Sequence, residues 1–228
     1  MKKWLEKLFG IKLDTQKVEH VDPIVAQKEA FLAFDDKLEV IIVSDNHEAK
    51  TGLENVLETY PDADYYFHCG DSNMDSDLEI MKPFVTVKGN TDYSYNYNPS
   101  EWVHLSSGEH VWMTHGHGYE VHRGNEKLVE FATDKGRSSL GPEFAGPATH
   151  MVFYGHTHVV DVAMKEGVLV INPGSIALPR GGTFIRSYAR LEITPERYDI
   201  QIMNAMDHTI VETFQFPREW RQPNRDPE

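Results

Sequence analysis

The chain has 228 residues, of which 40% are hydrophobic and 11% aromatic, enough for a globular domain with a sizeable core. Its formal net charge of −14 argues against a nucleic-acid-binding surface, because contacts with a phosphate backbone need clustered Lys and Arg side chains. No apolar run is as long as a membrane span and Cys69 is the only cysteine, so we expect a cytoplasmic protein without a transmembrane segment or an intrachain disulfide.

Residues 1–36 are predicted to form a helical appendage in front of the main domain. In the first helix, over residues 1–13, apolar residues recur at helical spacing. This helix would dock on its own domain or, alternatively, contact a membrane surface or a partner. Pro23 indicates the start of a second helix, which would end near residue 34 and bury Ile24, Phe31 and Leu32.

The main domain, residues 37–216, begins with alternating strands and helices. Helical spacing of apolar residues predicts a helix near 53–60 and a short one near 78–81. This alternation favours parallel strands joined by right-handed crossovers. Apolar runs predict the strands themselves over residues 38–43, 63–68 and 84–87.

The second half of the chain is predicted to be mainly β. A helix is expected over 126–135, followed by a Gly- and Pro-bearing loop that could cover a site or join the subunits of a homo-oligomer. Residues 217–228 are polar and are predicted to be a tail. Strands are predicted over residues 102–105, 111–114, 151–154, 159–164, 168–171, 184–193, 197–203 and 209–216.

Polar side chains that can bind a divalent metal follow several of these strands. Each lies just beyond an apolar β run, and a Gly stands beside most of them, which lets the strand turn sharply. Because ligands of open α/β sheets bind beyond the carboxyl ends of strands, the pattern predicts a metal site there. The residues are Asp45, His47, Asp71, Asn90, His115, His156 and His158.

The order of the motifs DNH, GD, GN, HGH, GHTH and NPGS resembles that of the calcineurin-like metallophosphoesterases. Within that superfamily, the chain is most similar to the small YfcE-like phosphodiesterases of bacteria and archaea, over about residues 38–214. The resemblance implies an α/β fold, a four-layer α/β/β/α sandwich of two mixed β-sheets flanked by helices. It also implies a dinuclear metal centre, a metal-bridging water or hydroxide, and a small phosphoester as substrate.

The resemblance also divides the candidate ligands between two divalent ions. It assigns Asp45, His47 and His158 to one metal, and Asn90, His115 and His156 to the other. Asp71 would bridge the two and take part in catalysis. The mixture of oxygen and nitrogen ligands suits Mn²⁺ best here, with Fe, Ni²⁺ and Zn²⁺ as alternatives.

One departure from the larger members of the superfamily concerns the leaving group. Those members carry a His at the position of Thr91, placed to protonate the leaving group, and a threonine hydroxyl has no useful pKa for that role. His117 could act as the catalytic acid instead, or could orient a metal ligand, as we expect of Asp92. The alternatives to a phosphodiesterase are a phosphomonoesterase and a non-catalytic scaffold, such as a trafficking-coat subunit with this fold.

Overall fold

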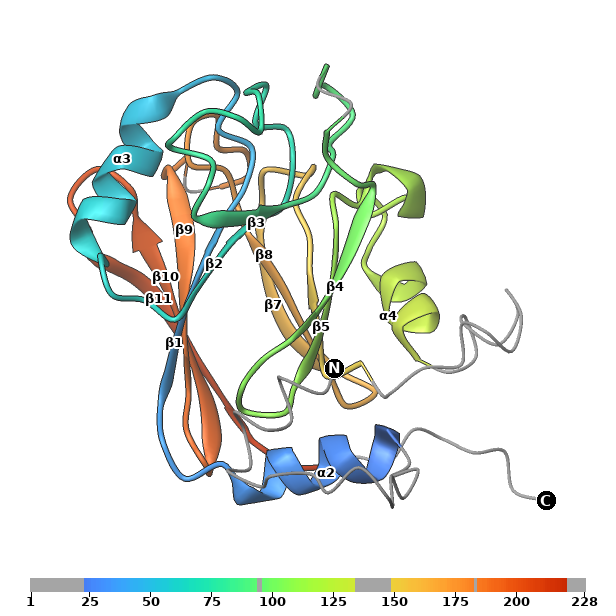
Figure 1. Cartoon of the computed structure of the whole chain (residues 1–228). Helices are drawn as coiled ribbons and strands as arrows, with labels where there is room; N and C mark the ends of the chain where they lie inside the picture. Colours follow the sequence, from blue (N-terminus) through green and yellow to red (C-terminus); the bar gives the residue numbers. More distant parts are fainter. Residues whose placement is uncertain (1–22, 94–95, 134–148, 183, 221–228) are drawn as a thin grey trace.

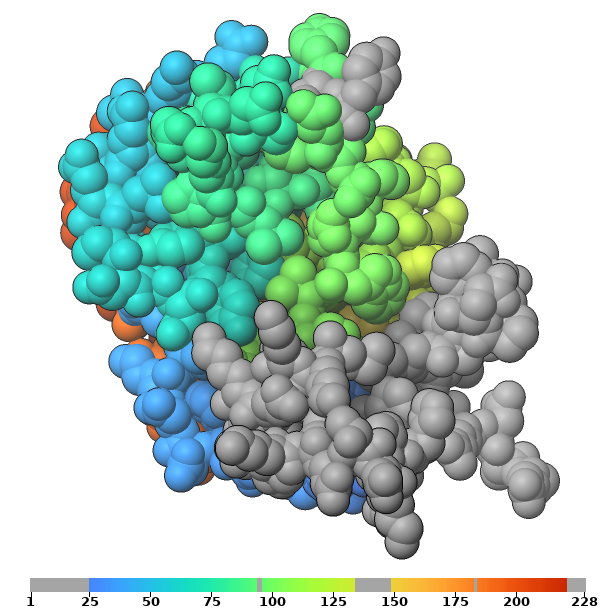
Figure 2. All heavy atoms as spheres, in the orientation of Figure 1, coloured from blue at the N-terminus to red at the C-terminus, as the bar shows by residue number. Residues whose placement is uncertain are grey.

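The computed structural model of the protein describes residues 23–93, 96–133, 149–182 and 184–220. Two mixed β-sheets pack face to face, α3 covers the outer face of the first sheet and α4 that of the second (Figure 1). In the space-filling view, the teal atoms of the β2 and β3 region lie directly against the green atoms of the β4 and β5 region (Figure 2). The predicted four-layer α/β sandwich is therefore confirmed.

The first sheet has six strands in the order β11-β10-β9-β1-β2-β3. β1, β2 and β3 are parallel, as the alternation of strands and helices predicts, whereas β9 pairs with β1 in the antiparallel direction. β1 is thus a central strand. The bounds are β1 (Leu38–Val43), β2 (Tyr65–His68), β3 (Phe84–Thr86), β9 (Ser187–Ile193), β10 (Arg197–Asn204) and β11 (Ile210–Pro217).

The second sheet has five strands in the order β4-β5-β6-β8-β7. β5, β6 and β8 are parallel, and each outer strand forms an antiparallel hairpin with its sequence neighbour, β4 with β5 and β7 with β8. The bounds are β4 (Ser100–His104), β5 (His110–Thr114), β6 (Met151–Phe153), β7 (Val160–Lys165) and β8 (Val168–Pro173).

The apolar run of β1 is buried on both faces of its sheet. Successive side chains of a strand point to opposite faces, so Val40 and Ile42 enter the core between the sheets. Ile41 and Val43 point the other way and pack with Leu53 of α3 (Lys50–Thr59). Burial of each such side chain stabilises the fold by about 1.5–3 kcal/mol. α4 (Glu126–Ala132) covers the second sheet in the same way, through a third apolar cluster.

The predicted short helix near residues 78–81 is wrong. The segment forms consecutive turns instead, in which Leu78 N–H donates to Asp75 O and Met81 N–H donates to Leu78 O. Pro83 follows directly, and the residue before a proline is disfavoured in the α conformation, which stops a helix from growing.

The helix α2 (Pro23–Ala33) begins at the predicted proline, but it buries a different face. Phe31 is buried, whereas Leu32 is 64% exposed, so the prediction for Leu32 is wrong. Gln27 is buried instead, because residues four apart lie on the same side of a helix. The predicted helix over 1–13 lies outside the described residues, as does the side chain of Ile24.

The chain just beyond β11 packs against α2. The guanidinium of Arg218 lies 3.8 Å from the ring centroid of Phe31, and its Nε donates to Oε1 of the fully buried Glu109 at 2.6 Å. Trp220 also packs edge-on against Phe31. The packed part of the chain thus reaches at least Trp220. Among the helices of the described part, none is both long enough and apolar enough to cross a membrane.

Candidate metal centre

The loops that follow β1, β2, β3, β5 and β6 come together at one edge of the sandwich (Figure 1). These are the carboxyl ends of the parallel strands, where α/β sheets bind ligands. Two groups of side chains there bring potential ligand atoms within 4.8 Å of one another. The first group is Asp45, His47 and His158, and the second is Asp45, Asp71 and His115.

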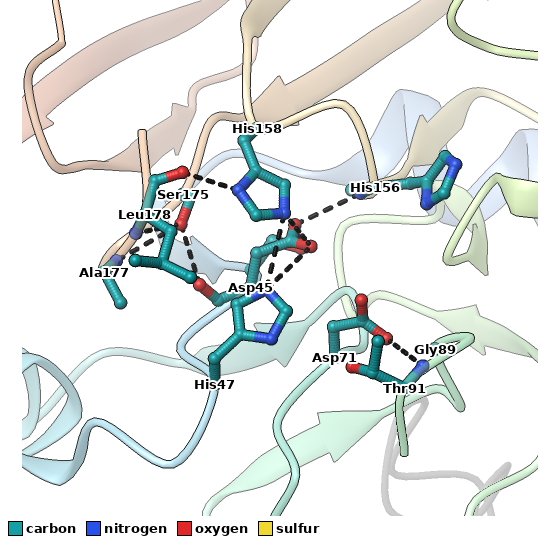
Figure 3. Close-up of polar contacts among 12 residues, drawn as sticks. Asp45, His47, Asp71, Gly89, Thr91, His156, His158, Ser175, Ala177 and Leu178 are labelled. Atoms are coloured by element: carbon teal, nitrogen blue, oxygen red, sulfur yellow. Dashed lines mark hydrogen bonds and ion pairs between the residues drawn. The ribbon is translucent and has the colours of Figure 1, made fainter. Parts of the chain in front are cut away.

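In the first group, two imidazoles face one carboxylate (Figure 3). Nε2 of His158 lies 3.2 Å from Oδ1 of Asp45, and Nε2 of His47 lies 4.0 Å from the same oxygen. The two Nε2 atoms are 3.4 Å apart. Asp45 and His158 are buried, and His47 is partly exposed, so the cluster opens to solvent on the side of His47.

The other ring nitrogen of each imidazole is bound to an oxygen. Nδ1 of His158 lies 2.5 Å from Leu178 O, and Nδ1 of His47 lies 3.0 Å from Oδ1 of Asn73. Both oxygens can only accept, so each Nδ1 carries a proton. Each ring can therefore present the lone pair of its Nε2 to the centre, which is the usual arrangement of metal-binding histidines.

The environment of Oδ1 of Asp45 also favours a cation in this group. The side chain is fully buried, and Oδ1 has no well-formed hydrogen bond, whereas Oδ2 accepts from Ser44 Oγ and from the backbone N–H of His156. A buried carboxylate oxygen without a donor is costly. Burial lowers the pKa of His158, but Asp45 outweighs it and raises that pKa, so this position attracts a proton or a metal ion.

The second group lies beside the first and shares Asp45 with it. Nε2 of His115 is 3.4 Å from Oδ2 of Asp71 and 3.1 Å from Oδ1 of Asn90, while its Nδ1 faces Cys69 O at 2.7 Å. Nε2 is again directed at the oxygens of the centre. Asp71 and His115 are buried, and Asn90 lies at the exposed rim.

In the second group, Asp71 and His115 each stabilise the charged form of the other. Burial alone would raise the pKa of Asp71, but the hydrogen bond and charge of His115 and the N–H of Thr91 hold it well below the ordinary value. Burial lowers the pKa of His115, but Asp71 and the charge of Asp45 outweigh this effect and raise it. Asp71 is therefore ionised at neutral pH, as a metal-binding carboxylate must be.

His156 belongs to neither of the two candidate groups. Its ring points away from Asp45 and Asp71 (Figure 3), and its centroid lies 5.2 Å from that of His115. His117 is exposed at the start of η1 (His117–Tyr119), with its ring centroid 5.6 Å from that of His115. Burial and the charge of His115 lower the pKa of His117, so this ring is mainly neutral at pH 7.

Two glycines let the backbone pass directly beside the carboxylates. A Cβ atom on Gly89 would lie 2.0 Å from Oδ1 of Asp71, and one on Gly155 would lie 2.1 Å from Oγ of Ser44. Neither position has room for a side chain. The glycines of the GN and GHTH motifs are thus required by the close packing of the strand ends around Asp45 and Asp71.

Asp92 holds the two loops that carry Asp71 and Asn90. Its Oδ2 accepts from the backbone N–H groups of Asp71 at 2.9 Å and Gly89 at 2.7 Å. Its Oδ1 accepts from Asn73 N at 2.6 Å and from Ser72 Oγ at 3.1 Å. One buried carboxylate therefore links the ends of β2 and β3 through their backbone and side-chain donors, in the orienting role that the sequence suggests.

Ser175 and Asn172 were not identified as functional from the sequence, although the NPGS motif contains both. Oγ of Ser175 donates to Asp45 O at 2.7 Å and accepts from Leu178 N, whose own carbonyl binds His158 (Figure 3). Nδ2 of Asn172 donates to Gly155 O at 2.8 Å. Both residues fix the backbone of the ligand-bearing turns.

His68, at the end of β2, gave no signal in the sequence. It is fully buried, its Nδ1 accepts from Gly70 N at 3.2 Å and its Nε2 donates to Oδ1 of Asn46 at 2.8 Å. Burial lowers its pKa to about 4, so the ring is neutral at pH 7. Through Asn46 and Gly70, His68 therefore holds the loops that carry Asp45 and Asp71.

Comparison with known proteins decides the family. The model of the calcineurin-like phosphoesterase superfamily domain matches residues 38–196. The chain belongs to this superfamily. The resemblance seen in the order of the motifs is thereby confirmed. Membership and the two candidate ligand groups together support a metal-dependent hydrolase of phosphoester bonds.

Three proteins of the comparisons show the extent of the similarity. The probable metallophosphoesterase YsnB of Bacillus subtilis is 27% identical over 144 residues, 63% of this chain and 78% of that protein. Phosphodiesterase MJ0936 of Methanocaldococcus jannaschii is 24% identical over 159 residues, 60% of this chain and 83% of that protein. A predicted phosphoesterase of Streptococcus pneumoniae, known from a crystal structure, is 28% identical with a TM-score of 0.69, and the match covers 80% of this chain and 98% of that one.

Proposed function

We propose that the protein is a phosphodiesterase with a dinuclear metal centre, acting on small phosphoesters. The observation that carries the proposal is the buried Oδ1 of Asp45, which lacks a well-formed hydrogen bond and faces the Nε2 atoms of His47 and His158. Activity on diesters is favoured because MJ0936, which is similar over 60% of this chain, is named a phosphodiesterase.

The residues would divide between two divalent ions. Asp45, His47 and His158 would hold one ion, and His115, Asn90 and His156 the other, with Asp71 between them. Mn²⁺ fits this mixture of imidazole and oxygen ligands best, with Fe, Ni²⁺ or Zn²⁺ as alternatives. When bound, two such ions activate a water molecule and offset the negative charge of the phosphate.

The protein's own groups would orient the reactants and move a proton. Asp71 stays ionised because His115 and the Thr91 N–H stabilise its charge. His117 is exposed beside His115 and can give a proton to the leaving oxygen. Thr91 takes no part in proton transfer, because its hydroxyl donates to Oδ1 of Asn73 at 3.1 Å.

The test combines elemental analysis with initial rates on bis(4-nitrophenyl) phosphate and 4-nitrophenyl phosphate. We expect metal-loaded protein to cleave the diester faster than the monoester, and Asp71→Asn to lose both activities while it stays folded. Faster cleavage of the monoester would replace the proposal by a phosphomonoesterase. Protein that binds no metal and cleaves neither ester would instead be a scaffold of the same fold.

A further inference from the structure

An open pocket with a volume of about 280 Å³ lies beside the candidate metal centre. It is lined by Asn73, Met74, Asp75 and Tyr93. These residues belong to the loops that follow β2 and β3, the same loops that carry Asp71 and Asn90. The pocket therefore adjoins the metal centre along both loops, and its size approaches the lower end of the range for small-ligand sites.

Asn73 forms the wall between the pocket and the metal centre. Its Oδ1 lies 3.0 Å from Nδ1 of His47 and accepts from Thr91 Oγ1 at 3.1 Å, while its Nδ2 donates to Thr91 O at 2.5 Å. Its backbone N–H is held by Asp92. The side chain and the backbone of Asn73 are therefore both held in place by hydrogen bonds. A phosphoester with its phosphorus at the metal centre can extend one ester group past Asn73 into the pocket.

The chemistry of the lining favours a flat, uncharged ring. The Tyr93 side chain is 85% exposed, and its ring stacks on no aromatic ring of the described residues. Its face is therefore open for stacking, as on the aromatic platforms that bind nucleobases. Asp75 is exposed and supplies a carboxylate that can accept from an N–H group of a ring. The same charge, with the exposed Asp77 nearby, repels a second phosphate.

We propose that this pocket binds the nucleobase of a nucleoside phosphoester, with the base stacked on Tyr93 and an N–H group of the base donated to Asp75. This inference rests on the proposed function only for the position of the phosphate at the metal centre. The pocket is a recognition site, distinct from the residues that hold metal, so it can be tested by binding as well as by turnover.

The binding test compares two ligands that share a phosphate and differ in the nucleoside. We would measure the affinities of thymidine 5′-monophosphate and methyl phosphate for the metal-loaded protein by calorimetry. Tyr93→Ala should weaken the nucleotide by about tenfold, since stacking contributes about 1–3 kcal/mol per base. The affinity for methyl phosphate should stay unchanged. Tyr93→Phe keeps the ring face and should bind both ligands like the parent protein.

The contact with Asp75 has its own control. Methylation of N3 of the thymine removes the N–H donor, so it should weaken binding several-fold to the parent protein but not to Asp75→Ala, which has no side-chain acceptor. Equal losses for both phosphates in Tyr93→Ala, or no gain of affinity from the nucleoside, would overturn the proposal. A protein that binds the nucleotide through Tyr93 but cleaves no phosphoester would retain the pocket and reject the proposed function.

Discussion

The Nε2 atoms of His47 and His158 lie 3.4 Å apart, and each ring is held by an oxygen acceptor at its Nδ1. Two lone pairs at this distance repel each other unless a cation lies close to both. The carboxylate of Asp45 lies beside the pair. A divalent ion satisfies all three groups at once, whereas a single proton can satisfy only one pair of atoms.

The first prediction is therefore that metal binding stabilises the protein through His158. Addition of Mn²⁺ to chelator-treated protein should raise the melting temperature, because a ligand that binds only the folded state stabilises it. His158→Ala should abolish most of this rise. The control is His104→Ala on the edge strand β4, which should keep the parental response. The melting temperatures are measured by scanning calorimetry. An equal rise of the melting temperature in His158→Ala and in the parent protein would argue against the site.

The second prediction concerns Asp92, which accepts four hydrogen bonds. In Asp92→Asn one oxygen becomes an amide group, so two of the four donors lose their acceptor. We expect the free energy of unfolding to fall by roughly 2–6 kcal/mol, since each of the two unsatisfied buried donors costs about 1–3 kcal/mol. The affinity for metal should fall by about 10–100-fold, as for other residues that orient ligands.

Urea unfolding of metal-free protein and metal titration measure these two effects of Asp92→Asn separately. The exposed Asp62→Asn removes the same charge from the surface and serves as the control. Parental metal affinity in Asp92→Asn would show that the loops after β2 and β3 hold their positions without this carboxylate.

Much of the fold was predictable because its signals are local. The apolar run of β1 and the polar residues after it predict both a buried strand and the positions of Asp45 and His47 at its end. The ligand groups were predictable for the same reason, since parallel strands carry their carboxyl ends to one edge. The turns at 78–81 were missed because apolar spacing outweighed the effect of Pro83.

Other features depend on contacts that a sequence does not display. Leu32 and Phe31 are adjacent apolar residues, and only the packing of α2 decides which of them is buried. His68 resembles any polar residue at a strand end, and its burial arises from the loops folded over it. The orientation of the His156 ring is likewise a matter of side-chain rotation, which no motif specifies.

The third prediction uses the buried, neutral His68. Its pKa is lowered from 6.5 to about 4 in the folded protein, so below pH 6.5 the unfolded chain binds a proton that the folded chain does not. The contribution of His68 to stability is therefore full above pH 6.5 and is lost as the pH falls towards 4. The loss is roughly 3 kcal/mol by the cost of a pKa shift.

The measurement for His68 is urea unfolding of chelator-treated protein at pH 7.5 and pH 4.5. His68→Gln has no ring to titrate, so its stability should fall by roughly 3 kcal/mol less than that of the parent over this interval. The contribution of the carboxylates to the pH dependence of stability is the same in both proteins, so it cancels in this comparison. Identical pH profiles for the two proteins would mean that His68 has the same pKa in the folded and the unfolded state.

The last prediction concerns the proton that the leaving group needs. A general acid must be protonated, so a rate that depends on His117 is present below the pKa of its ring and is lost as the pH rises through that pKa. Burial and the charge of His115 lower this pKa below 6.5, which places the loss on the acidic side of neutrality. The effect should appear with phenyl methyl phosphate, and not with 4-nitrophenyl methyl phosphate, whose leaving group departs without a proton.

The pH profiles of kcat/KM for the two esters, with metal content matched, provide the measurement for His117. In His117→Ala the phenyl ester should lose about 10²–10⁴-fold at low pH, the usual contribution of a general acid, while the nitrophenyl ester changes little. Thr91→His should restore part of the lost rate, because the backbone N–H of residue 91 donates to Oδ1 of Asp71 at 2.8 Å, so a ring at this position starts beside the metal centre. If both esters slow equally in His117→Ala, the residue orients a neighbouring ligand such as His115, and the leaving group departs as an anion.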